Sequence, residues 1–419
     1  MKPKLSLFAV FIVTLCITLA CGGTAQMPTS TLEPTLDQPT QEAATETSTP
    51  ASATETPLPA PGPESVSGCN LPPRAFTNVG LGLPKPSQRL PSVGDVTTIV
   101  LFVDFPDVPA AQSPNGVFNL VSPGAENFFK AISYGRMNYI LQPHFVWLRL
   151  SQPAAFYGGG IGTFEGHRGF IQEAVNLADA EVDFSKADSV LVLTPPEAIA
   201  VAYGPAFGGD ETNGYSADGK VFANGVTSGA DLPGWGYLWL NHETGHNLSL
   251  PDLYAYQYDS ANYDDQHRFV GGFGLMGYID GHGPEFFAFE RWQLGWLDDN
   301  QIICQTEAEG TAELTPIEIA GSTKAVIIPL SETKAVVVES RRRMGYDQDL
   351  VKEGALVYTV DTSIFSGEGP VVVYPILEND PYRDQSPLGV GESVTVEGVT
   401  ITVLEARPET DIVQITVVK

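Results

Sequence analysis

The chain has 419 residues, of which 43% are hydrophobic and 17% are charged, and its formal net charge is −28. This length indicates two folded units with additional tails, and the hydrophobic content is ample for sizeable cores. The negative charge argues against nucleic acid as a partner, because phosphate binding needs clustered Lys and Arg. It is compatible with a soluble, exported protein.

Residues 1–21 resemble an export signal. Two lysines near the start are followed by an apolar run over residues 5–20. This run is too short and too N-terminal for a comfortable membrane span. Cys21 follows a small residue and precedes two glycines, as in a bacterial lipoprotein signal in which this cysteine is lipidated. Thr18 stands where such signals usually carry an aliphatic residue, so ordinary signal cleavage is the alternative.

Residues 22–66 are predicted to form a stalk. Positions 24–65 are rich in Thr, Pro, Ser, Ala and Glu and contain no aromatic or basic residue. Such a segment cannot bury enough apolar surface to offset its ordering entropy, so it should stay disordered. Its prolines and like charges should keep it extended. A stalk of this kind lifts a domain off a membrane, which independently supports a lipid anchor.

Two cysteines, Cys69 and Cys304, remain after the signal. In an oxidising compartment they favour one disulfide, which would join the starts of the two folded regions. Two unpaired buried thiols are the alternative. A further alternative is a free Cys69 whose thiol blocks a metal ion.

The first folded region is expected to begin near residue 68 and to interleave strands with helices. A Ser-Pro pair at 122–123 suits the N-cap and first position of a helix. Residues 204–229 are Gly-rich and are predicted to be irregular and to border a substrate cleft. Apolar and alternating patterns predict the following elements: strands 97–103, 138–150 and 189–193, and helices 122–132 and 170–180.

A helix predicted near 236–248 carries the motif HExxH. His242 and His246 are four residues apart, so their rings project from one face of the helix. Two neutral imidazoles so placed can hold one zinc ion at roughly 2.0–2.1 Å. Glu243 can act as a general base toward a water at the metal. Asp252 lies beyond the helix end, where the chain can turn back and offer a third ligand. A bare HExxH also arises by chance on an ordinary amphipathic helix.

Two further features favour the zinc interpretation. The string continues as HExxHxxSxxD, close to the metzincin form HExxHxxGxxH, and Met276 lies downstream in a plausible Met-turn. Met276 is expected to form a hydrophobic floor and not to bind the metal. Ser249 replaces the usual glycine, and a serine carries more strain at positive φ. Tyr278 either approaches the metal or stabilises an oxyanion, as in some metzincins, or it is a packed aromatic residue.

Other polar residues near the motif allow weaker predictions. The acidic side chains of residues 252–282 include hard oxygen ligands that suit calcium. No loop spacing there matches a calcium motif, so solvated surface charge is the alternative. His267 and His282 either touch substrate or are exposed or structurally bonded, while His144 and His167 are expected to be structural or exposed. A helix over 284–296 is predicted to pack its aromatic side chains beneath the Met-turn.

From about residue 301 the pattern changes to short apolar runs separated by turn signals. This spacing predicts an all-β domain of the sandwich type, which is either structural support or a weak substrate-binding module. The predicted strands are 325–330, 335–339, 355–360, 393–396, 399–403 and 412–418.

These motifs resemble the immune inhibitor A family of bacterial secreted metallopeptidases, which are metzincin-like zinc enzymes. The likeness covers about residues 95–365, and HETGHNLSLPDLY at 242–254 is its most specific part. It implies that His242, His246 and Asp252 bind zinc and that Glu243 is the base. The serine at 249 and the lack of an obvious long propeptide depart from the family. Weaker parts of the likeness lie at 103–107, 133–136, 274–276, 292–296, 338–341 and 354–357.

The sequence therefore predicts an α+β protein. A zincin or metzincin-like domain over 67–300, with a mixed sheet and an active-site helix, should precede a sandwich-like β domain over 301–419. The expected function is an extracellular zinc endopeptidase that acts on proteins or peptides and touches the membrane only through a lipid on Cys21. One alternative is an inactive cell-surface binding protein on a peptidase scaffold, although the intact Glu243 argues against it. Another is a zinc hydrolase of non-peptide esters or amides.

Overall fold

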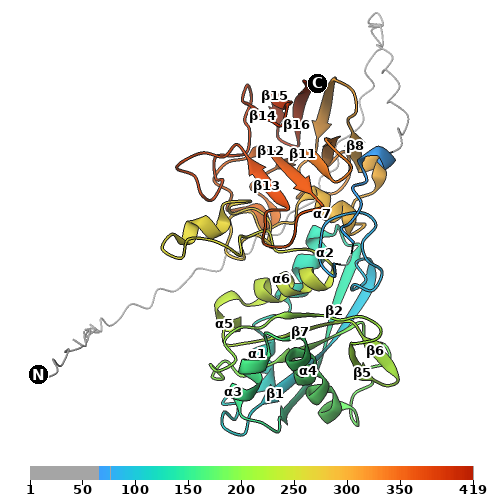
Figure 1. The fold of residues 1–419 in the computed structure, drawn as a ribbon, viewed down its shortest axis with the longest axis vertical. Coiled ribbons are helices and arrows are strands. Elements are labelled where there is room, and N and C mark those ends of the chain that lie inside the picture. The colour runs from blue at the N-terminus through green and yellow to red at the C-terminus, as the bar shows by residue number, and fades with distance from the viewer. Residues whose placement is uncertain (1–65, 76, 419) are drawn as a thin grey trace, which may run out of the picture. The chain divides into compact units, whose positions relative to one another are not determined.

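The computed structural model describes residues 66–75 and 77–418 (Figure 1). The predicted signal peptide and all but the last residue of the predicted stalk lie outside the described residues. The described chain is a mixed α+β structure with several sheets and few helices, which confirms the predicted class. Among these residues, no helix combines the length and the apolarity that a bilayer span requires.

The helices are short, and three of them differ from the predicted boundaries. The helix predicted from 122 begins at Gly124, because Ser122 donates its hydroxyl to Glu126 (2.8 Å) instead of capping the backbone. The helix predicted from 170 begins six residues earlier, where Thr163 accepts the Gly166 N–H. The α-helices are α1 Pro114–Phe118, α2 Gly124–Ile132, α3 Ala154–Gly160, α4 Phe164–Ala178, α5 Leu232–Trp235, α6 Tyr237–Asn247 and α7 Ala288–Gln293. Single 3-10 turns lie at Val66–Cys69, Tyr263–His267, Asp299–Gln301 and Gly345–Asp347.

The helix predicted over 284–296 is also shorter than expected, because its first residues make other bonds. The Gly274 and Leu275 N–H groups donate to the carbonyls of Gly283 and Pro284. This pairing holds the segment before α7 in an extended form alongside the predicted Met-turn. The aromatic side chains of α7 still join the same core as Met276, as predicted.

The first sheet has the strand order β2-β1-β3-β7-β4 (Figure 1). Strands β2, β1, β3 and β7 are parallel, and β4 is antiparallel at one edge. The three strands predicted for this region are all present. The bounds are β1 Gly94–Asp104, β2 Met137–Arg149, β3 Ser189–Leu193, β4 Ala206–Gly208 and β7 Asn224–Thr227.

Strand β1 is buried on both faces because helices cover the two sides of the sheet. Val100 and Phe102 belong to a core that includes residues of α2 and α6. Leu101 and Val103 point to the other face and join a core that includes residues of α4. This two-residue alternation explains why the sequence shows a continuous apolar run here.

The Gly-rich segment 204–229 is not irregular, which corrects the prediction. It forms β4 and β7 of the first sheet and a separate hairpin of β5 (Tyr215–Ala217) and β6 (Lys220–Phe222). Its glycines allow close packing: a Cβ at Gly225 would lie 3.2 Å from the Tyr215 ring. Short strands of this kind lack the apolar run from which the other strands were predicted.

The C-terminal region contains two packed sheets, as predicted. Their strand orders are β13-β12-β11-β10-β8 and β14-β15-β16-β9, and their inner faces share one core. All six predicted strands are present, and β8, β9 and β13 are additional. The bounds are β8 Ile302–Cys304, β9 Glu309–Leu314, β10 Ala325–Pro329, β11 Lys334–Arg341, β12 Gly354–Asp361, β13 Val371–Tyr374, β14 Ser393–Val396, β15 Val399–Arg407 and β16 Thr410–Val417.

The two predicted domains share a core across residue 300. Along β11, Val336 and Val338 face the sandwich interior. Val337 faces the other way and joins the core that contains α6 and α7. A disulfide between Cys69 and Cys304 adds a covalent link, which confirms the predicted pairing and excludes free thiols. The sandwich is therefore packed directly against the layer that carries the HExxH helix.

Candidate metal centre

Helix α6 presents the motif on one face, close to the predicted boundaries. It follows Gly236, whose φ of +57° favours glycine, and it ends at Asn247. The His242 and His246 rings lie one turn apart with centroids separated by 4.9 Å. Ser249 then adopts a φ of +90°, the strained conformation anticipated for this position. Gln293 offsets this strain in part by donating to the Ser249 hydroxyl (2.9 Å).

The turn after α6 returns Asp252 to the two histidines. Asp252 Oδ1 lies 3.1 Å from His242 Nε2 and 3.3 Å from His246 Nε2. The three ligand atoms lie within 4.8 Å of one another and form the only such group of three among the described residues. The structure therefore brings together the three residues predicted to bind zinc.

The hydrogen bonds of the imidazoles show which nitrogen faces the centre. Nδ1 of His242 bonds to the Leu275 carbonyl (2.9 Å), and Nδ1 of His246 bonds to the Leu250 carbonyl (2.8 Å). A carbonyl can only accept, so each Nδ1 carries a proton and each Nε2 faces Asp252. When such a ring is neutral, its Nε2 carries a lone pair that can bind a metal ion. Backbone carbonyls orient metal-binding histidines in this way in many proteins.

This donor set fits a zinc ion. Two nitrogen lone pairs and a carboxylate oxygen converge, and a cation relieves the repulsion among these acceptors. Zinc bonds of about 2.0–2.1 Å at tetrahedral angles place ligand atoms about 3.3 Å apart. The two measured separations, 3.1 and 3.3 Å, agree with that spacing.

Without a metal, the charges of this cluster are balanced by protons. Burial lowers the pKa of His246, but Asp252, Glu243 and the Leu250 carbonyl together outweigh burial and raise the pKa to about 9. Burial raises the pKa of Asp252, and the two histidines outweigh it and hold the pKa well below its usual range. The cluster thus has a strong demand for positive charge at its centre.

Glu243 lies beside this cluster and lines both cavities at the site. Its Oε2 accepts the Ala206 N–H (2.6 Å), so the edge strand β4 holds the carboxylate in place. Burial raises the pKa of Glu243, and the neighbouring histidines oppose that effect. A carboxylate with a raised pKa is better suited to accept and return a proton near neutral pH.

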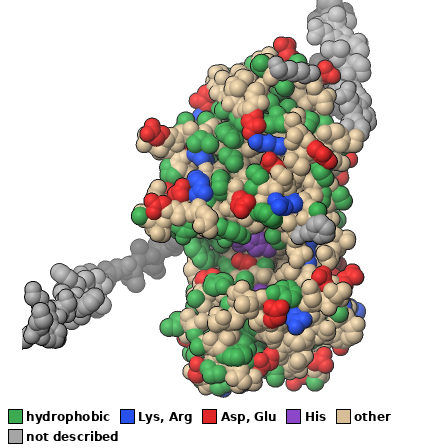
Figure 2. Space-filling model, in the orientation of Figure 1, with side chains coloured by type: hydrophobic (Ala, Val, Ile, Leu, Met, Phe, Trp, Pro, Cys, Tyr) green, Lys and Arg blue, Asp and Glu red, His purple; other side chains and the backbone are tan. Residues whose placement is uncertain are grey.

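The cluster opens onto two adjoining cavities. One has a volume of about 330 Å³ and is lined by β4, the metal-site loop and Val79. The other, about 270 Å³, is largely aromatic. Figure 2 shows a hollow on the visible face in which histidine and acidic side chains are exposed. The aromatic cavity is lined in part by Tyr203, Trp235, Trp239, Tyr254, Tyr263 and Tyr278.

Met276 and Tyr278 occupy different environments. Met276 is fully buried, and a Cβ at Gly245 would lie 2.4 Å from its sulfur, so it forms the apolar floor under α6. Tyr278 packs against His267 with ring centroids 4.0 Å apart and ring planes tilted by 33°, and it lines the aromatic cavity. No hydrogen bond joins its hydroxyl to the metal cluster in the part of the chain that the structure describes. Its catalytic role stays a prediction.

The remaining histidines have separate settings. His267 lines the aromatic cavity with Tyr278, and His282 lies 4.0 Å from Asp384 on the surface. His144 lies 3.5 Å from Glu181, and His167 is buried against Thr227 (3.0 Å). Burial lowers the pKa of His167 to about 3, so it is neutral and structural, as predicted. 

The predicted calcium site has no matching cluster. Within residues 66–75 and 77–418, no second group of three His, Cys, Asp or Glu side chains converges. Two of the acidic residues make local bonds instead: Asp265 pairs with Arg268 (3.0 Å), and Asp264 accepts from Tyr382 (2.5 Å). Calcium binding stays a prediction.

Three residues of the site were not predicted to act there. Tyr256 donates its hydroxyl to Asp252 Oδ2 (2.6 Å), and Ser366 accepts the Asp252 N–H (2.9 Å). Tyr254 lines both cavities, with its ring 6.3 Å from that of His242. The two tyrosines lie just after the motif and could have been found by their proximity. Ser366 has no sequence signal, because it lies more than 100 residues away.

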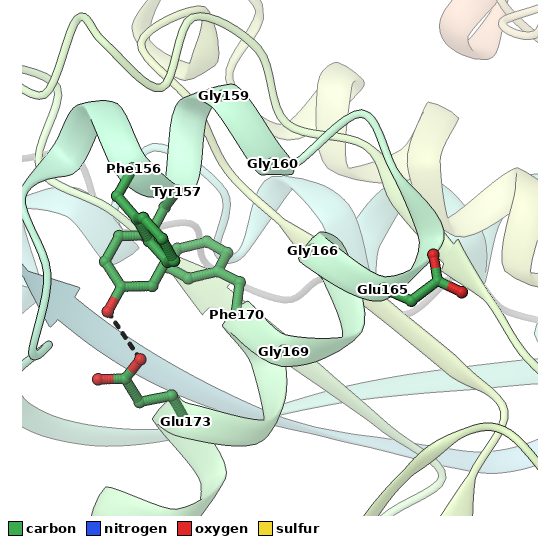
Figure 3. Close-up of a pocket in the computed structure, with 9 residues that line it drawn as sticks. All are labelled: Phe156, Tyr157, Gly159, Gly160, Glu165, Gly166, Gly169, Phe170 and Glu173. Carbon is green, nitrogen blue, oxygen red and sulfur yellow. Dashed lines mark hydrogen bonds between the residues drawn. The ribbon is translucent and has the colours of Figure 1, made fainter.

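Another hollow, of about 460 Å³, lies between α3 and α4 (Figure 3). Phe156, Tyr157 and Phe170 form its aromatic wall, and Tyr157 donates to Glu173 (2.7 Å). Glu165 lies away from that pair in the view. Its two carboxylates, Glu165 and Glu173, lie apart, and no group of three candidate metal ligands converges there among the described residues.

A search against known protein families found no match, and a search of curated proteins found none either.

Proposed function

We propose that this protein is a zinc-dependent endopeptidase with a metzincin-like catalytic domain. The observation that carries the proposal is the convergence of His242, His246 and Asp252 next to Glu243 at an open cleft. A closed structural zinc site uses four protein ligands, whereas a catalytic site uses three and keeps one position open. Three side-chain ligands beside a cavity correspond to the catalytic arrangement.

The residues of this chain have distinct tasks in the proposed reaction. A zinc ion, when bound, acidifies water and polarises a carbonyl group. Glu243 accepts the proton of the attacking water and returns it to the leaving amine. Tyr254 is a stronger candidate than Tyr278 to donate a hydrogen bond to the developing oxyanion. Burial, with the Asp252 carboxylate, raises the pKa of Tyr254 and keeps its hydroxyl protonated.

The edge of the first sheet supports a peptide as substrate. β4 is the last strand of that sheet, and Pro205, Ala206 and Gly208 line the cavity that holds the metal ligands. An extended peptide can add to a strand edge through backbone hydrogen bonds, while pockets receive alternate side chains. The aromatic cavity beside Glu243 is suited to receive one such side chain.

The proposed location is extracellular, with a lipid on Cys21 as the tether. The disulfide between Cys69 and Cys304 supports an oxidising compartment. The net charge of −28 agrees with a soluble exported domain that does not bind nucleic acid.

The test is a comparison of the wild type with Glu243→Ala. Both proteins should bind zinc with the same stoichiometry, and the variant should lose activity on casein by about 10²–10⁴-fold, the usual contribution of a general base. A variant that binds zinc and cleaves casein at the wild-type rate would overturn the assignment. Zinc binding by a wild type that cleaves no protein or peptide would instead support a binding protein on a peptidase scaffold.

A further inference from the structure

A loop of the C-terminal sandwich lies against the metal-site turn. This loop, residues 362–370 between β12 and β13, is called the β12–β13 loop here. The Gly367 N–H donates to the Asp252 carbonyl (3.0 Å), and the Tyr256 N–H donates to the Gly367 carbonyl (3.0 Å). The two backbone bonds fix the turn that carries the third ligand against a segment more than 100 residues away.

Side chains from both segments hold Asp252 itself. Tyr256 donates its hydroxyl to Asp252 Oδ2 (2.6 Å), and the same hydroxyl lies 3.0 Å from Ser366 Oγ. Ser366 Oγ also accepts the Asp252 N–H (2.9 Å). Of these bonds, only the one from Tyr256 reaches the carboxylate, at Oδ2, and Oδ1 is left directed at the two histidines. The carboxylate therefore cannot rotate freely.

The backbone of the β12–β13 loop is shaped for this contact. Gly367 has a φ of +75°, a conformation that favours glycine. A Cβ at this position would lie 2.2 Å from the nearest ring carbon of Tyr256. Any larger residue would separate the loop from the tyrosine that bonds Asp252. The glycine thus permits an approach that other residues prevent.

We propose that the β12–β13 loop is part of the metal centre, with Ser366 and Tyr256 as positioning residues that orient the carboxylate of Asp252. The proposal rests on the proposed function, because it assumes that Asp252 binds the metal. It gives the C-terminal sandwich a direct task, since this domain supplies Ser366 and Gly367. Outer partners of metal ligands typically contribute 10–100-fold to metal affinity.

The test measures zinc affinity of the full-length protein by competition with a chromophoric chelator. Tyr256→Phe and Ser366→Ala should each weaken zinc binding by about 10–100-fold. Tyr258→Phe and Ser363→Ala are matched controls: Tyr258 is an exposed tyrosine nearby, and Ser363 lies in the same loop but bonds Asp361. Both controls should bind zinc as the wild type does.

Three further experiments separate positioning from general damage. Ser366→Thr restores a hydroxyl and should recover most of the lost affinity, and thermal unfolding of the metal-free variants identifies any that fail to fold. With cobalt in place of zinc, Tyr256→Phe should change the visible absorption spectrum, which Tyr258→Phe should leave unchanged. Wild-type zinc affinity and an unchanged cobalt spectrum in the folded Tyr256→Phe and Ser366→Ala proteins would overturn the proposal.

The zinc-affinity results can be interpreted whether or not the protein proves to be a peptidase. If the wild type binds zinc but cleaves nothing, the proposed function fails while the affinity series still tests the loop. If the wild type cleaves casein and the Tyr256→Phe and Ser366→Ala variants bind zinc normally, only the positioning role fails.

Discussion

Two regions that bury charged groups differ in how the charges are balanced. One is the proposed metal centre at α6. The other, called the ion cluster here, consists of Glu285, Arg291, Glu339, Arg341 and Asp347, all of them buried. The ion cluster contains its own cations, and it lines neither cavity at the metal centre.

The charges of the ion cluster are balanced by direct ion pairs between its own side chains. Arg341 pairs with Glu339 (2.6 Å) and Asp347 (2.6 Å), and Arg291 pairs with Glu285. Arg291 also donates to the carbonyls of Ile132 (2.8 Å) and two other residues. A buried group of charges that supplies its own partners is a structural feature. The metal centre instead collects three acceptors that face one another and a cleft, which indicates a site for an external cation.

The largest effect should follow from removing a metal ligand. His246→Ala leaves two of the three ligands, so zinc affinity should fall by more than the roughly 100-fold expected for an outer partner, and cleavage should cease. The ion cluster is untouched, so the metal-free variant should keep the near-UV circular dichroism of the metal-free wild type. Zinc competition and casein assays measure the first effect. Retention of tight zinc binding would contradict the ligand assignment.

Breaking the ion cluster should lower the stability of the protein and leave its zinc affinity unchanged. Arg291→Met leaves the Glu285 carboxyl buried without its partner, and the free energy of unfolding should fall by about 3–5 kcal/mol. Zinc affinity, measured well below the unfolding temperature, should not change. Urea unfolding with and without zinc separates the two quantities. A variant that is as stable as the wild type would show that the cluster is not needed for the fold.

A carboxyl beside the ion cluster should make stability depend on pH. Burial, together with nearby Glu339, raises the pKa of Glu290 to about 8. The Phe287 N–H and nearby Arg341 lower this pKa and oppose the effect in part. The pKa of a glutamate side chain in an unfolded chain is about 4.3, so the folded state binds the carboxyl proton of Glu290 more tightly than the unfolded state does. The stabilisation that proton binding by Glu290 contributes to the free energy of unfolding is therefore complete below about pH 4.3. It is lost as pH rises toward 8, by at most about 1.4 kcal/mol per pH unit.

Glu290→Gln removes this dependence. The variant and the wild type should differ least near pH 5, and the variant should become relatively more stable toward pH 8. Urea unfolding of both proteins at pH 5, 6.5 and 8 measures the change. Parallel pH profiles for the two proteins would show that Glu290 is not protonated in the folded state.

The smallest effect concerns the strained turn at Ser249. Ser249→Ala and Ser249→Gly both remove the hydroxyl that Gln293 bonds. Only glycine relieves the φ of +90°, so the glycine variant should be more stable than the alanine variant by about 1 kcal/mol. Thermal unfolding of the two variants side by side gives this difference. Equal stabilities would mean that the turn carries no backbone strain.

The sequence was most informative where function or burial imposes a local pattern. His242, Glu243, His246 and Asp252 lie within eleven residues. Helix periodicity could therefore place the two histidines on one face, and a short turn after the helix could return Asp252 to them. The buried strands β1 and β3 were predicted from continuous apolar runs. The short strands β5 and β6 lack such runs, and α7 is shortened by the backbone pairing of residues 283–284, which no local pattern shows.

Contacts made by distant segments could not be predicted. Ser366 reaches Asp252 because the sandwich packs against the first layer, and its own neighbours in sequence give no hint of a metal site. Ala206 acts through its backbone N–H, which carries no side-chain signature. The sequence therefore predicted which candidate ligands come together, whereas the groups that hold them in place required the fold.

The most direct test of the account is a zinc titration of metal-free full-length protein with casein cleavage as the readout. The cleavage rate should rise with added zinc and level off at one equivalent per chain, and excess chelator should abolish it. Cleavage that does not depend on zinc, or one bound equivalent without any cleavage, would contradict the claim that His242, His246, Asp252 and Glu243 form a catalytic metal centre.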